Sequence, residues 1–111
     1  MAPWYSGILF RSWARENHKS QKAKARVKNN LLEIFIPIFN SGEVTTLSSA
    51  EDCHRNLKAT FNAYTRIYPK LFNEKSVQKL SQILADGFLI EGKVNNSYLN
   101  PDEIQKIIGN L

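Results

Sequence analysis

The apolar residues of this chain recur every three or four positions in four successive stretches, and this spacing constrains the fold more than any other feature. An α-helix places residues three or four apart on one face, so each stretch predicts a helix with one buried side. The four apolar stripes are Ala23, Val27, Leu31, Ile34 and Ile38; Ala50, Cys53, Leu57, Phe61, Tyr64, Ile67 and Leu71; Val77, Leu80, Ile83 and Leu84; and Ile104, Ile107, Ile108 and Leu111. We therefore expect a mostly helical protein.

Three of these helices have sequence signals for their first residues. Ser48 to Glu51 matches a capping box, in which a serine and a glutamate satisfy each other's backbone N–H groups. Asn73 suits the N-cap of the third helix, and Asn100 followed by Pro101 suits the start of the fourth. We expect the first helix to begin between Ser6 and Ile8, and its basic part to span about residues 8–30.

Prolines and glycines mark the other ends. We expect Pro37 to end or kink the first helix near Ile36, the second helix to end near Tyr68 before Pro69, and Gly87 to follow the third. For residues 31–39 there is an alternative, a strand from Ile34 to Phe39 after a shorter basic helix. We expect six residues to lie in the core or in the seam of a helix-mediated dimer: Trp13, Val27, Leu57, Phe61, Leu80 and Leu84.

A short hairpin is expected between the last two helices. Phe88–Val94 and Ser97–Leu99 are β-prone, and Asn95 with Asn96 tolerates the positive φ of a tight turn. The 111 residues leave room for one domain. The expected fold is a single α+β domain over residues 1–111, predominantly α-helical with one short β-hairpin, and the alternative is an all-α helical bundle.

Positive charge is concentrated in the first quarter of the sequence. Residues 1–30 hold seven basic side chains and one acidic one, a net charge of +6, whereas the other 81 residues hold eight basic and nine acidic side chains. Five of the cations follow helical spacing along one face about 22 Å long. We call them the basic ribbon: Arg11, Arg15, Lys19, Lys22 and Arg26. Such a ribbon can follow a phosphate backbone or lie as a solvated helix face.

The order of helix, short helix and hairpin over about residues 72–99 resembles the second half of a winged helix-turn-helix domain. The resemblance implies that residues 73–86 take the place of the recognition helix and that Lys93 and Asn96 lie on the wing. The outward face of that helix would then present Lys75, Gln78, Lys79 and Gln82 to a DNA groove.

The residues required for catalysis or for a metal site are not found in this sequence. Cys53 is the single cysteine, which excludes an internal disulfide, and its place on an apolar stripe predicts a buried thiol. His18 and His54 each lack a second ligand at metal spacing. We expect no enzyme activity, no catalytic residue, no metal and no cofactor.

No apolar run reaches the roughly 20 residues that a membrane span needs. We expect a cytoplasmic protein, although a basic N-terminal helix is also compatible with organellar import. The leading function is non-enzymatic binding of nucleic acid, with DNA in a regulatory role. The alternative is an adaptor, inhibitor or immunity-type module that docks its basic helix on an acidic protein surface or forms a helix-mediated homodimer.

Overall fold

The computed structural model describes the backbone of residues 3–111 and the side chains of residues 20–111. Its elements are α1 (Pro3–Phe39), α2 (Leu47–Ile67), α3 (Glu74–Ala85), β1 (Leu89–Ile90), β2 (Lys93–Val94), the 3-10 helix η1 (Asn96–Leu99) and α4 (Pro101–Gly109). This architecture confirms the expected α+β class with predominant helix and one short hairpin.

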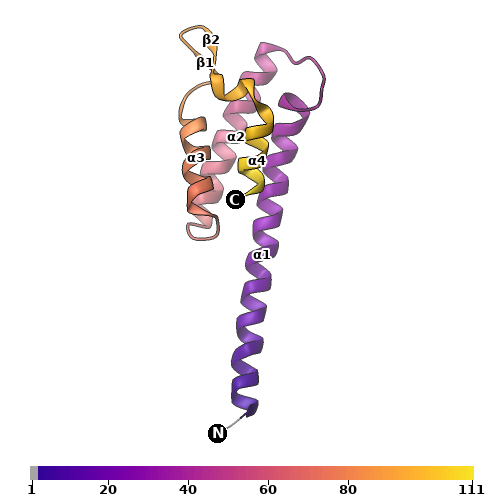
Figure 1. The fold of residues 1–111 in the computed structure, drawn as a ribbon, viewed down its shortest axis with the longest axis vertical. Coiled ribbons are helices and arrows are strands. Elements are labelled where there is room, and N and C mark those ends of the chain that lie inside the picture. Colours follow the sequence, from indigo (N-terminus) through magenta and orange to yellow (C-terminus); the bar gives the residue numbers. More distant parts are fainter. Residues whose placement is uncertain (1–2) are drawn as a thin grey trace.

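The C-terminal half of α1 packs against α2 and α4, and α3 packs against α4 and α2. The N-terminal half of α1 projects from this bundle (Figure 1), and the described chain measures 68 × 24 × 19 Å. The projecting half carries much of the basic ribbon, so most of the ribbon lies outside the helical bundle.

The core forms where the four stripes meet. The largest side chains with less than 2% exposure include Leu31 and Phe35 of α1, Leu57 and Phe61 of α2, Leu80 and Leu84 of α3, and Ile104 and Ile108 of α4. The core prediction is thus confirmed for Val27, Leu57, Phe61, Leu80 and Leu84, whereas the side chain of Trp13 lies outside the described residues.

The first stripe was predicted with its phase slightly wrong. Val27, Leu31 and Phe35 are fully buried at four-residue spacing, while Ile34 and Ile38 are half-buried beside them. In the second stripe Ile67 is 64% exposed, because it is the last residue of α2 and lies beyond the bundle's core.

We predicted that Pro37 either ends or kinks the first helix near Ile36, and the predicted end of the helix is wrong. The alternative, a strand from Ile34 to Phe39, is also wrong. The helix continues to Phe39, and the N–H of Asn40 still donates to the carbonyl of Ile36 at 2.9 Å. A proline in the last turn removes only the hydrogen bond to the carbonyl four residues earlier. Packing of Phe35 and Phe39 in the aromatic core offsets that loss.

Helix α2 begins two residues earlier than the proposed capping box. Its N-cap is Thr46, whose hydroxyl oxygen accepts from the N–H of Ser49 at 3.1 Å. The predicted N-cap Asn73 of α3 is confirmed, because its side chain accepts from the N–H of Ser76 at 3.2 Å. Pro101 opens α4 as expected, but Asn100 makes no side-chain cap hydrogen bond there.

The hairpin exists, but its turn lies four residues earlier than predicted. Leu89 pairs with Val94 and Ile90 with Lys93, so Glu91 and Gly92 form the two-residue turn, with φ of +52° and +80°. Two positive φ values are typical of the hairpin turn that matches strand twist, and glycine accepts them more readily than asparagine.

Asn95 and Asn96 do not form the hairpin turn but begin the 3-10 helix η1. The side chain of Asn95 accepts from the N–H of Ser97 at 3.0 Å and donates to the carbonyl of Gly87 at 3.1 Å, so it caps η1. The predicted strand Ser97–Leu99 is therefore part of a 3-10 helix, and Asn96 is the first residue of that helix rather than a residue of the hairpin turn.

Gly87 follows α3 without the left-handed conformation of a helix-ending glycine, since Asp86 before it is already extended. A side chain at position 87 would approach the carbonyl oxygen of Leu89 to 3.2 Å, so close backbone packing explains this glycine.

Candidate nucleic-acid interface

Two residues of the basic ribbon have described side chains, and both are exposed. Lys22 and Arg26 lie one turn apart on α1, while Val27, next to Arg26, is fully buried. The ribbon and the buried stripe therefore occupy different faces of the helix. The side chains of Arg11, Arg15 and Lys19 lie outside the described residues.

A seam of polar contacts fixes this part of α1 against the end of α2. The amide of Asn30 donates to the hydroxyl of Tyr64 at 2.6 Å, and one turn earlier the guanidinium of Arg26 reaches the hydroxyl of Tyr68 at 3.5 Å. Because Tyr68 is the C-cap of α2, the ribbon enters the bundle beside the α2–α3 connection.

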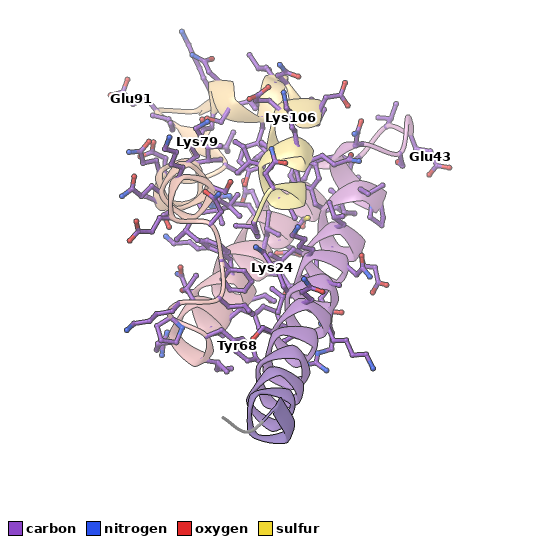
Figure 2. The ribbon with its side chains drawn as sticks, turned by 60° about the horizontal axis from the view of Figure 1, so that its bottom comes forward. Lys24, Glu43, Tyr68, Lys79, Glu91 and Lys106 are labelled. Carbon is purple, nitrogen blue, oxygen red and sulfur yellow. The ribbon has the colours of Figure 1, made fainter. Side chains whose placement is uncertain are left out.

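The residues around that connection add cations to the ribbon, and two of them, Arg66 and Lys70, were not predicted from the sequence. Arg66 in the last turn of α2, Lys70 in the connection and Lys75 in the first turn of α3 are all exposed. We call the exposed cations at this end of the bundle the basic end: Lys22, Arg26, Arg66, Lys70 and Lys75. Figure 2 brings this end forward and labels Tyr68 within it and the half-buried Lys24 nearby.

The acidic side chains gather at the opposite end of the bundle. Of the nine acidic residues beyond residue 30, seven lie in the α1–α2 connection, in the second turn of α2, in the first turn of α4, or from the end of α3 to the hairpin turn. They are Glu43, Glu51, Asp52, Asp86, Glu91, Asp102 and Glu103. Glu74 lies beside Lys75, and Arg55, Lys93 and Lys106 lie in the elements of the far end, so it is the balance of charge that is polarised along the bundle.

The predicted outward face of the third helix is exposed at Lys75, Gln78, Lys79 and Gln82. Only Lys75 belongs to the basic end, because α3 runs away from the α2–α3 connection toward the hairpin (Figure 1). Lys79 and Gln82 line a groove with Ser97 of η1 and Ile107 of α4. The structure therefore separates most of this face from the basic ribbon.

Lys93 is exposed on β2, next to the hairpin turn and among the acidic residues of the far end. The structure does not bring it near Lys22 or Arg26, since the hairpin and the α2–α3 connection lie at opposite ends of the bundle (Figure 1).

Cys53 and His54 are both buried, but they face different elements. The thiol of Cys53 donates to the carbonyl of Ile34 at 3.2 Å, and burial raises its pKa to about 11. The thiol is therefore protonated at neutral pH, which makes it a poor nucleophile. His54 instead points to η1, where its Nδ1 is hydrogen-bonded to the hydroxyl of Tyr98.

Sequence reasoning missed the burial of His54. The signal was present, because His54 falls four residues after Ala50 and three before Leu57, on the edge of the second stripe. Burial and the nearby charge of Lys58 lower the pKa of His54, while a backbone hydrogen bond with Asp86 acts in the opposite direction.

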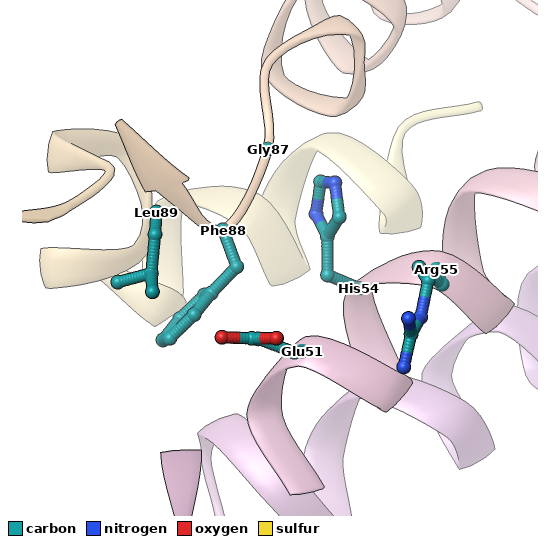
Figure 3. A pocket seen from close by; sticks show the side chains of 6 residues that line it. All are labelled: Glu51, His54, Arg55, Gly87, Phe88 and Leu89. Carbon is teal, nitrogen blue, oxygen red and sulfur yellow. The ribbon is translucent and has the colours of Figure 1, made fainter. Parts of the chain in front are cut away.

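A cavity of about 240 Å³ opens beside His54 and is also lined by Glu51, Arg55, Gly87, Phe88 and Leu89 (Figure 3). The three polar side chains do not converge: Glu51 lies toward Phe88, His54 toward Gly87, and Arg55 away from both (Figure 3).

In the described part of the chain, no three His, Cys, Asp or Glu side chains form a group suited to a metal ion. No helix described by the structure has the length and apolar character of a membrane span.

Comparisons with known proteins found no matching family model, no matching curated protein and no matching solved structure.

Proposed function

We propose that this protein is a non-enzymatic nucleic-acid-binding protein, with DNA in a regulatory role as its leading ligand, and that it holds the phosphate backbone with the basic end and the ribbon that continues from it. The polarised charge of the bundle is the observation that supports this proposal. Exposed lysines and arginines at one end, with acidic residues at the other, would orient the molecule in the field of a polyanion.

The exposed face of α3 has a secondary part in the proposal. Lys75 extends the basic end onto this helix, and Gln78 and Lys79 follow one turn later with side chains that suit base edges or phosphates. The winged-helix resemblance remains a prediction. Contact through the hairpin is disfavoured by charge, because residues 86–94 hold two acidic side chains, Asp86 and Glu91, against the single cation Lys93.

The test is the salt dependence of binding, measured by fluorescence anisotropy on labelled duplex DNA, single-stranded DNA and RNA of random sequence. Removing one cation that neutralises a phosphate reduces the slope of log K against log salt by about 0.9 on duplex DNA. We expect the double variant Lys22→Gln/Arg26→Gln to lower that slope by up to about 2.

A matched control removes the same charge elsewhere. The double variant Lys93→Gln/Lys106→Gln also loses two exposed lysine charges, but from the hairpin and α4. We expect it to keep most of the slope. Equal reductions in both variants would show that only net charge matters, and no binding at about 50 mM salt would favour an acidic protein partner instead.

A further inference from the structure

His54 is the polar centre of a buried junction between α2 and the segment 88–99, which contains the hairpin and η1. His54 and Tyr98 are 5% and 6% exposed, and the imidazole Nδ1 is hydrogen-bonded to the Tyr98 hydroxyl. In Figure 3 the imidazole points from α2 toward the chain at Gly87. The two rings also meet edge to face, with centroids 5.5 Å apart.

Most hydrogen bonds of the segment 88–99 join residues within the segment itself. The N–H of Asn95 donates to the carbonyl of Phe88 at 2.8 Å, and the N–H of Tyr98 donates to the carbonyl of Asn95 at 2.9 Å. Among the side chains that the structure describes, the His54–Tyr98 pair is the one hydrogen bond that ties this segment to α2.

Its other attachments are aromatic. The ring of Tyr98 lies 4.7 Å from that of Phe39 and 5.3 Å from that of Phe88, and Phe39 and Phe88 lie 5.7 Å apart. Tyr98 therefore joins α1, α2 and Phe88, the residue before β1, to η1. A change at its hydroxyl acts on the whole junction.

Protonation of His54 is incompatible with this arrangement. In the tautomer that carries its proton on Nε2, the neutral ring accepts the Tyr98 hydroxyl hydrogen at Nδ1, whereas the protonated ring has a donor at both nitrogens. The hydroxyl of Tyr98 would then have to accept instead of donate, and its own hydrogen would lose its acceptor inside the bundle. A buried polar group left in this way is costly.

The charged and titratable groups around the ring also oppose its protonation on balance. Lys58 on α2 repels a second positive charge, and Cys53 on the same helix stays a neutral thiol. Arg55 and Glu51 line the adjacent cavity with opposite charges. From the α3–β1 connection, the backbone of Asp86 favours the proton, but burial outweighs it and the pKa of His54 is lowered from its ordinary value of 6.5.

We propose that His54 and Tyr98 form an acid-sensitive latch, which holds the segment 88–99 on the bundle at neutral pH and releases it when His54 is protonated. The latch is independent of the proposed nucleic-acid binding. A group whose pKa is lowered in the closed state stabilises that state fully above its ordinary pKa. The stabilisation is lost as the pH falls below about 6.5 and through the lowered value.

Amide hydrogen exchange followed by NMR tests the proposal directly. Protection factors corrected for the intrinsic pH dependence of exchange are compared at about pH 7.5 and about pH 5. We expect them to fall for Asn95 and Tyr98, whose N–H groups donate hydrogen bonds within the segment, and to stay constant for Leu57 and Phe61 in α2. The NMR titration of His54 gives a second measurement, a pKa below 6.5.

The two measurements must agree, which makes the test quantitative. By linkage, the fall in the logarithm of protection approaches the difference between the His54 pKa in the released and latched states once the pH lies below both values, so the comparison is extended downward until the His54 titration is complete. His54→Asn places an amide oxygen near Nδ1 that accepts from Tyr98 without titrating, so the fall should disappear. His18→Asn removes the other histidine and should leave the fall intact.

A His54 pKa at or above 6.5 in the folded protein would overturn the proposal. So would pH-independent protection of the segment 88–99, and so would an equal fall in α2, because that would indicate global unfolding. These readings come from the unaltered chain and stand even if His54→Asn fails to fold.

Discussion

The position of the hairpin turn can be tested by substitution, because Glu91 occupies a backbone conformation that glycine and asparagine tolerate better. Its φ is +52°, in the left-handed region, and the following Gly92 has φ of +80°. A residue other than glycine, asparagine or aspartate in that region costs roughly 1–2 kcal/mol. Asn-Gly is also the preferred pair for this type of turn.

We expect Glu91→Asn to raise the free energy of unfolding by about 0.5–1 kcal/mol, since asparagine relieves only part of that strain. Gly92→Ala should lower it by about 1–2 kcal/mol, because alanine brings a Cβ into the left-handed region. No atom lies within 4 Å of a Cβ at position 92, so the destabilisation would come from the backbone rather than from a clash. Urea unfolding followed by circular dichroism measures both changes.

Asn96→Gly serves as the control for a turn at residues 95–96. In the structure Asn96 begins η1 at negative φ, so glycine should cost a few tenths of a kcal/mol instead of stabilising the chain. The reasoning would be refuted if Asn96→Gly stabilised the protein while Gly92→Ala had no effect. A changed urea m-value would show that a variant altered more than the turn.

Two further predictions concern packing and capping. Leu57→Ala should lower the free energy of unfolding by about 2–5 kcal/mol because Leu57 is fully buried, whereas Ile67→Ala, at a 64% exposed site, should change it by less than about 0.5 kcal/mol; equal effects in thermal or urea unfolding would contradict the observed burial. Asn73→Ala should cost about 1 kcal/mol because it removes the hydrogen bond to the N–H of Ser76, and Asn100→Ala should cost less because Asn100 makes no such bond; the opposite order would contradict the assigned caps.

Helix existence and most of the core were predictable because each stripe carries its own periodicity. Leu57, Phe61, Leu80 and Leu84 were identified from spacing alone, and the structure buries all four. The boundaries were less predictable where two signals compete within a few residues. Thr46 and Ser48 are both good N-caps by residue type, and in the structure it is Thr46 that accepts the capping hydrogen bond from Ser49.

The hairpin turn was misplaced because two turn signals stand four residues apart. Gly92 and the pair Asn95-Asn96 both accommodate positive φ, and glycine is the stronger turn signal of the two. The contact between His54 and Tyr98 joins residues 44 positions apart, so no local pattern predicts it.

For the candidate interface, the sequence identified the ribbon but not the cations that surround it. Arg66 and Lys70 belong to different local segments and follow no common spacing with Arg26. They join the ribbon only because α2 runs back along α1, which brings Tyr68 to Arg26. The spacing of residues in the sequence therefore does not predict a surface that forms when distant segments pack together.

The contact between the first and last helices also determines the order in which the molecule can be assembled during synthesis. The amide of Asn40, just after α1, donates to Gln105 at 2.6 Å and to Asp102 at 3.0 Å, across more than 60 residues. Until residues 101–111 have been made, the side of α1 that α4 covers has no partner from its own chain. Nascent chains shorter than this therefore expose apolar surface, and we expect them to be the species that chaperones bind and that aggregate when synthesis stalls.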